Sequence, residues 1–179
     1  LIEHFRHSEV ENLVAKEGPR VSEKTVPAAE KILADTFTFL KVTDKVPRHS
    51  DGHLDWFHTG PENDQEWAWQ INRHGVINTL MRAWFDTGNP EYAKYVDKFV
   101  KDWIISSWPY PEVNNHTAMW RTLEIGLRVR SWPEFFYNLI NTGYLSPATT
   151  LLVLSTLSEH AHALTHFHGG NHNHLTMEM

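Results

Sequence analysis

The feature that most constrains the fold is a run of apolar side chains at helical spacing over residues 63–87. Steps of four and three along this stretch connect Trp67, Ile71, His74, Asn78, Met81 and Phe85. Because an α-helix completes a turn every 3.6 residues, this spacing places the whole row on one face. The pattern predicts a single amphipathic helix over 63–87 that buries this face.

Capping residues divide the following chain into helix hairpins. Gly88 suits the position just after a helix, and Asn89-Pro90 suits the N-cap and first residue of the next helix, predicted over 90–106. So short a connection predicts antiparallel packing of the two helices. Ser146-Pro147 opens a later helix in the same way. Its apolar row consists of Leu151, Leu154, Leu157, His160 or Ala161, and Leu164.

The rest of the chain also favours helices. We expect helices over 27–40 and 117–132, the second ended or kinked by Pro133, and an irregular loop over 43–63. No segment alternates like a sheet, so the predicted class is all-α, an α-solenoid or an α/α toroid. The chain begins at Leu1 and ends at Met179 within a helical pattern. We therefore expect a piece of a longer protein.

Composition disfavours several classes of function. A formal charge of -6 argues against nucleic acid and densely sulfated polyanions as partners, although 13 histidines could charge in acidic surroundings. The absence of cysteine excludes disulfides and thiolate zinc sites. No apolar run reaches the roughly 18 residues of a membrane span, and the N-terminal stretch is not an export signal.

A zinc site is a competing hypothesis near the C-terminus. His162 and His166 stand four residues apart, with His168 close behind. The glutamate of the metalloprotease motif is missing from between the pair, since Glu159 precedes it. We therefore predict no metal and no other cofactor.

The motif that carries chemistry is Gly169-Gly170-Asn171-His172, directly after the helix that Pro147 opens. An amide donor beside a titratable imidazole suits the stabilisation of a developing enolate. The structural alternative is that Asn171 caps a following helix and His172 is exposed. Spacing alone leaves both interpretations open.

Several motifs in order along the chain resemble one family. They are Gly60-Pro61-Glu62-Asn63-Asp64-Gln65-Glu66-Trp67 with Asn72-Arg73-His74, then Trp120-Arg121-Thr122-Leu123-Glu124 with Arg128, then Gly170-Asn171-His172. Over about residues 30–179 the sequence resembles the helical toroid of the heparinase II/III-like polysaccharide lyases, relatives of the alginate lyases. The resemblance implies an incomplete α/α toroid over 27–179, after an extended segment over 1–26.

The resemblance also implies a mechanism. It assigns to Asn171 the neutralisation of a uronate carboxylate and places His172 in the same subsite. It implies that a tyrosine acid, a second histidine and a β-sandwich lie beyond this stretch. It further implies a bacterial enzyme that is periplasmic or secreted.

Other residues are candidate contacts to an acidic polysaccharide. The resemblance implies that Arg121 and Glu124 organise the cleft, whereas their spacing with Arg128 predicts intrahelical ion pairs. The remaining candidates are Gln70, Arg73, His74 and His116, with Trp120 and Trp56 as sugar-stacking rings. Core packing is the alternative for the tryptophans and for His74.

Two further hypotheses compete with the lyase. Glu66 and Glu124 could be the paired carboxylates of a glycoside hydrolase, which requires a separation of about 5 to 9.5 Å across a cleft. The chain could also be a noncatalytic helical binding module. The lyase hypothesis predicts that the Asn171 loop, Trp120-Arg121 and the Trp67 helix converge on one pocket. The acidic balance ranks a weakly sulfated or unsulfated uronate polymer above heparin as the substrate.

Overall fold

The computed structural model describes residues 24–113 and 117–167. In chain order it contains α3 (Thr25–Leu33), β1 (Thr36–Phe39), β2 (Val42–Lys45), α4 (Gln65–Asn72), α5 (Val76–Thr87), α6 (Pro90–Ser106), α7 (Thr122–Leu139) and α8 (Pro147–His166). Helices dominate, which confirms the predicted helical class, while closure into a toroid stays a prediction.

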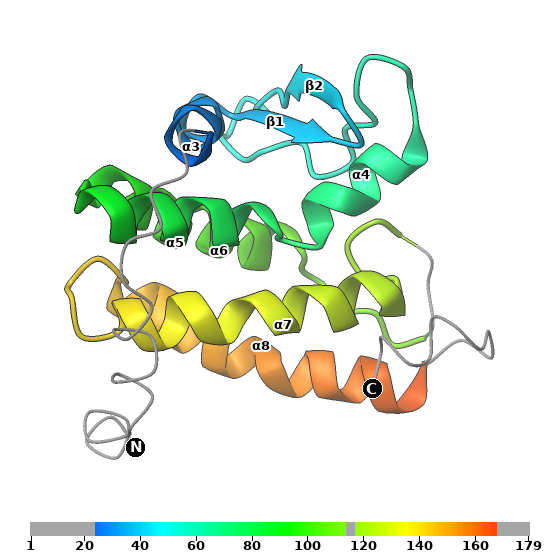
Figure 1. Cartoon of the computed structure of the whole chain (residues 1–179). Helices are drawn as coiled ribbons and strands as arrows, with labels where there is room; N and C mark the ends of the chain where they lie inside the picture. The colour runs from blue at the N-terminus through cyan, green and yellow to red at the C-terminus, as the bar shows by residue number, and fades with distance from the viewer. Residues whose placement is uncertain (1–23, 114–116, 168–179) are drawn as a thin grey trace.

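The helices pack in layers around one core. Figure 1 shows α3 and the two strands on one side of α5 and α6, with α7 and α8 on the other side. α5 packs against α6 and α7, and α6 packs against α8. The core is rich in aromatic side chains, and Trp103 at its centre is fully buried. Among the described helices, none has the length and apolar character needed to cross a membrane.

A β-hairpin replaces the second half of the helix predicted over 27–40. α3 ends at Leu33, and β1 pairs with β2 in antiparallel register, with Phe39 opposite Val42. Phe37 and Phe39 face the core, whereas Thr38 is exposed. The Thr-Phe-Thr-Phe alternation is thus a short strand signal that the helical interpretation missed. The prediction that no segment alternates like a sheet was therefore wrong for this stretch.

The helix predicted over 63–87 is two helices. His74 adopts a left-handed backbone with φ of 59°, which ends α4 and redirects the chain into α5. Asn72 secures the break, because its side-chain amide donates to the Trp56 and Ala68 carbonyls at 2.8 and 2.9 Å. Its oxygen accepts from Trp103 Nε1 at 2.8 Å. Buried polar contacts therefore override a continuous apolar stripe.

Helix boundaries set by capping residues agree with the sequence. Gly88 lies in the left-handed region after α5, with φ of 69°. The Asn89 side chain accepts from the Glu91 N–H at 3.1 Å, and that of Ser146 accepts from the Thr149 N–H at 3.2 Å. α7 instead begins at Thr122 and continues through Pro133 to Leu139. Pro133 is exposed, and buried Phe135, Phe136 and Leu139 carry the helix beyond it.

The face that α8 buries is not its leucine row. The buried side chains are Thr149, Val153, Thr156, His160 and Ala163. Leu151, Leu154 and Leu157 are instead exposed, by 69, 41 and 40%. The contacts with α6 and α7 therefore select a different row, and His160 is the one residue of the expected row that it contains.

Candidate functional site

An arginine joins the first half of the broken helix to α7. Arg73, at the C-terminal end of α4, donates from Nη2 to Glu124 Oε1 at 2.9 Å and from Nε to the same oxygen at 3.2 Å. Its Nη1 lies 2.9 Å from Glu66 Oε1. The break after Asn72 thus places Arg73 between carboxylates from two helices.

A second arginine approaches the same carboxylate. Arg121 immediately precedes α7, and its Nη1 donates to Glu124 Oε1 at 3.2 Å. The Arg121 guanidinium also lies 3.9 Å above the centre of the Trp69 ring, a cation–π contact. Gln70 Nε2 donates to Glu66 Oε1 at 3.0 Å. We call Glu66, Trp69, Gln70, Arg73, Arg121 and Glu124 the polar cluster.

The buried carboxylate of Glu124 fixes the positions of the Arg73 and Arg121 guanidinium groups. The Glu124 side chain is fully buried, whereas those of Arg73 and Arg121 are 16 and 17% exposed. A buried carboxylate is costly unless it is paired, so Glu124 holds both guanidinium groups in place. Its second oxygen, Oε2, has no hydrogen-bond partner among the described residues and is buried. Two positioned guanidinium groups at a surface can bind carboxylate or sulfate groups.

The predicted intrahelical ion pair forms on one side of Glu124 only. Arg121 pairs with Glu124, but Arg128 donates from Nη1 to the Asn72 carbonyl at 2.7 Å and from Nη2 to the Met119 carbonyl at 3.0 Å. Burial lowers the Arg128 pKa to about 9. Because these carbonyls lie close in sequence to Arg73 and Arg121, Arg128 holds the backbone that presents both arginines.

Three candidate sugar contacts lie in the core. His74 is fully buried, and its Nδ1 accepts from Trp132 Nε1 at 3.1 Å. Burial lowers the His74 pKa well below its ordinary value. Trp56 and Trp120 are 2 and 5% exposed. This burial corrects the expectation that the two tryptophan rings are available for stacking, and it favours core packing for all three residues.

The remaining candidates, Asn171, His172 and His116, lie outside the described residues. Figure 1 shows that α4, the start of α7 and the end of α8 lie at the same end of the molecule. α8 ends at His166, five residues before Asn171 in the sequence. Two of the three elements expected to converge on one pocket, α4 and the Trp120-Arg121 segment, meet at Glu124. A pocket at this place and the arrival of the Asn171 loop stay predictions.

The contacts of the two glutamates disfavour the hydrolase hypothesis. Glu66 and Glu124 bind opposite nitrogens of the same Arg73 guanidinium, both at 2.9 Å. The guanidinium therefore occupies the space where a glycosidic bond would have to lie. Both groups act as ion-pair partners in this arrangement.

The histidines of α8 form no metal site within residues 24–113 and 117–167. His162 and His166 stack with ring centres 4.2 Å apart, and no third histidine, aspartate or glutamate in the described ranges completes a group with them. His168 lies outside these ranges.

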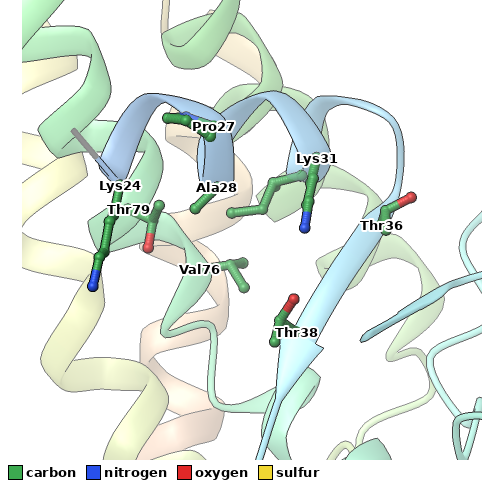
Figure 2. Close-up of a pocket in the computed structure, with 9 residues that line it drawn as sticks. Lys24, Pro27, Ala28, Lys31, Thr36, Thr38, Val76 and Thr79 are labelled. Carbon is green, nitrogen blue, oxygen red and sulfur yellow. The ribbon is translucent and has the colours of Figure 1, made fainter. Parts of the chain in front are cut away.

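An open groove lies between α3, β1 and α5. It has a volume of about 430 Å³, and its lining includes Lys24, Lys31, Thr36, Thr38 and Thr79 (Figure 2). No residue of the polar cluster lines it. The convergence of charged groups from distant segments therefore makes the polar cluster, rather than this groove, the candidate site.

Comparison with known proteins identifies the class to which this chain belongs. The family model described as heparinase II/III N-terminus matches residues 1–179. The chain therefore belongs to the heparinase II/III family, which is a family of polysaccharide lyases.

Relatives agree with this assignment. A heparin-sulfate lyase of Pedobacter heparinus is 29% identical over 114 residues, covering 63% of this chain and 17% of that protein. The heparan sulfate lyase HepC from Pedobacter heparinus has the same fold, with a TM-score of 0.74 and 23% identity over 88% of this chain and 24% of that chain. A heparinase III aligns with a TM-score of 0.75 and 20% identity over 90% of this chain and 27% of that chain. The chain thus spans about a sixth to a quarter of these relatives.

Proposed function

We propose that this chain contributes one wall of the active site of a lyase that cleaves uronic-acid-containing polysaccharides by β-elimination. The observation that carries the proposal is the convergence of Arg73 and Arg121 on buried Glu124. Two fixed guanidinium groups at the end of the molecule where α8 ends suit an anionic sugar chain. The names of the relatives, heparin-sulfate and heparan sulfate lyases, support a glycosaminoglycan as the substrate.

The reaction defines what the site must do. A base removes the proton at C5 of the uronate, and the electron pair moves into the carboxylate as an enolate. The C4–O bond then breaks, a C4–C5 double bond forms, and an acid protonates the departing oxygen. In this proposal Asn171 donates to the carboxylate and His172 lies in the same subsite, because a preorganised donor lowers the barrier where water is excluded.

The polar cluster would bind rather than react. The partly exposed arginines Arg73 and Arg121 pair with anionic groups on neighbouring sugars, while Glu124 and Trp69 fix their orientation. Gln70, held by Glu66, supplies an amide beside them. This division of roles predicts that losing a cluster arginine weakens binding more than it slows the chemical step.

A direct assay tests the proposal. The full-length protein is incubated with heparosan, heparan sulfate, hyaluronan, chondroitin and alginate, and the ultraviolet absorbance of the new C4–C5 double bond is followed. We expect Asn171→Ala to abolish product and Arg121→Gln to raise KM. Absence of unsaturated product from all five polymers, or full activity of Asn171→Ala, would refute the proposal.

The proposal also bears on the activity of the 179-residue chain by itself and on where the enzyme acts. The 179-residue chain alone should bind weakly and form no unsaturated product, since the tyrosine acid and second histidine are expected elsewhere in the protein. We place the enzyme in the periplasm or outside the cell, because its polymeric substrates do not cross a membrane unaided. A weakly sulfated or unsulfated polymer remains our preferred substrate, given the charge of -6.

A further inference from the structure

A large aromatic ring lies exposed at the end of α6. Trp108 is 64% exposed, whereas Trp56, Trp67, Trp103, Trp120 and Trp132 are each at most 5% exposed. The Tyr110 ring lies beside it, with centres 5.0 Å apart and planes inclined by 48°. We call these two side chains the aromatic pair. An exposed tryptophan has apolar surface that a ligand can cover.

Contacts attach the aromatic pair to the segment that carries Arg121. The Tyr110 ring packs edge-on against Trp120, with centres 5.1 Å apart. Trp120 Nε1 donates to the Ser107 carbonyl at 3.1 Å, which ties the end of α6 to the residue preceding Arg121. The end of α6 therefore lies at the same end of the molecule as α4 and the start of α7 (Figure 1). The aromatic pair and the polar cluster share one scaffold.

We propose that Trp108 is a sugar-stacking subsite that extends the polar cluster. One face of a pyranose ring presents C–H groups, which pack on a flat aromatic ring, while its rim carries hydroxyl and anionic groups. Trp108 supplies the flat apolar surface, and Arg121 supplies the cation for a neighbouring carboxylate or sulfate. This inference rests on the proposed function, since it extends the same binding site along the polysaccharide.

The conformation of Trp108 suits this role. Tyr110 lies between the exposed ring and the buried Trp120, so the pair is braced from the core side. A braced ring loses little freedom when a ligand covers it, which favours binding. The two rings that the sequence favoured for stacking, Trp56 and Trp120, instead form part of that core.

Nuclear magnetic resonance on the 179-residue chain tests the proposal. Indole N–H signals are followed during titration with a heparosan hexasaccharide and, separately, with an undersulfated heparan sulfate hexasaccharide. The Trp108 signal is assigned by its loss in Trp108→Ala. We expect this signal to shift on titration, and Trp108→Ala to weaken binding by roughly tenfold, as truncation of a central aromatic contact does. Trp108→Phe should retain most of the affinity.

A matched control lies near the C-terminal end of α5. Phe85 is 36% exposed, and its ring centre lies 5.0 Å from that of Trp84, so it forms a comparable aromatic pair. Phe85→Ala should leave sugar binding unchanged. Equal affinity of Trp108→Ala and the unchanged chain would overturn the inference, and so would a change in self-association without a change in sugar binding.

Comparing Arg121→Gln with Trp108→Ala distinguishes a failure of the Trp108 subsite from a failure of the proposed function. If Arg121→Gln weakens binding and Trp108→Ala does not, the subsite is refuted while the proposed function stands. If the unchanged chain shows no shift with either oligosaccharide, the subsite is refuted, and the lyase assay on the full-length protein decides the proposed function. Sulfate ions alone should shift signals near the arginines and leave the Trp108 indole unaffected.

Discussion

Arg128 Nε donates to His160 Nε2 at 3.1 Å in the centre of the core. The imidazole must therefore carry its proton on Nδ1, which lies 2.7 Å from the Thr156 carbonyl and donates to it. Burial, reinforced by the Arg128 charge, lowers the His160 pKa to about 3. A neutral histidine thus serves as the acceptor for a buried guanidinium that no described carboxylate contacts within ion-pair distance.

Acidification should destabilise the protein through this histidine. The folded-state pKa of His160, about 3, lies below the unfolded value of 6.5, so the unfolded chain binds more protons below pH 6.5. Stability should be greatest above pH 6.5 and fall between pH 6.5 and 4.5 by about 1.4 kcal/mol per unit for such a group. Urea unfolding across this range measures the slope. His160→Gln should reduce this slope, and buried His74 should account for part of what remains. An unchanged slope would contradict the assignment.

Replacing Arg128 should loosen the backbone around the site. Arg128→Met leaves the Asn72 and Met119 carbonyls without their donor, and unpaired buried polar groups cost free energy. We expect the free energy of unfolding to fall by about 3 kcal/mol. Chemical denaturation measures it, with Arg130→Met, an exposed neighbour, as control. An Arg128→Met variant as stable as the parent would contradict this role of the guanidinium.

Neutralising Glu124 should release both cluster arginines. Glu124→Gln removes the buried charge that Arg73 and Arg121 share, and breaking a buried pair costs about 3 kcal/mol. The loss should lower the midpoint temperature of thermal unfolding. The indole N–H signal of Trp69 in nuclear magnetic resonance spectra should shift as Arg121 moves. Glu91→Gln, which disrupts the exposed pair with Lys94, should have no measurable effect. Equal effects of the two substitutions would contradict the role of burial.

Substitutions at two adjacent residues of α8 should change the free energy of unfolding by very different amounts. Val153 is 2% exposed, and Val153→Ala should lower the free energy of unfolding by about 2 kcal/mol. Leu154 is 41% exposed, and Leu154→Ser should change it by less than about 0.5 kcal/mol in this chain. Denaturant titration of both variants measures the difference. A larger loss for Leu154→Ser would show that the leucine row is covered.

The site could be predicted in part because it combines local and distant contacts. Arg121 and Glu124 stand three residues apart on one helix turn, so their pairing follows from spacing. Gln70 and Arg73 were candidates because they lie on the predicted Trp67 helix, but the contact between Arg73 and Glu124 depends on how α4 packs on α7. The stacking of Arg121 on Trp69 and the exposure of Trp108 had no signal in the sequence.

Local chemistry in the sequence determined where several helices begin and end. Asn89-Pro90, Ser146-Pro147 and Gly88 act through hydrogen bonds and backbone angles within a few residues, so they need no tertiary context. The Thr-Phe-Thr-Phe alternation is likewise a local signal for the hairpin at Phe37 and Phe39. The tertiary structure decided the break at His74 and the face that α8 buries. Each of these depends on which side chains meet across the core, and burial energies there exceed the small preferences of individual residues.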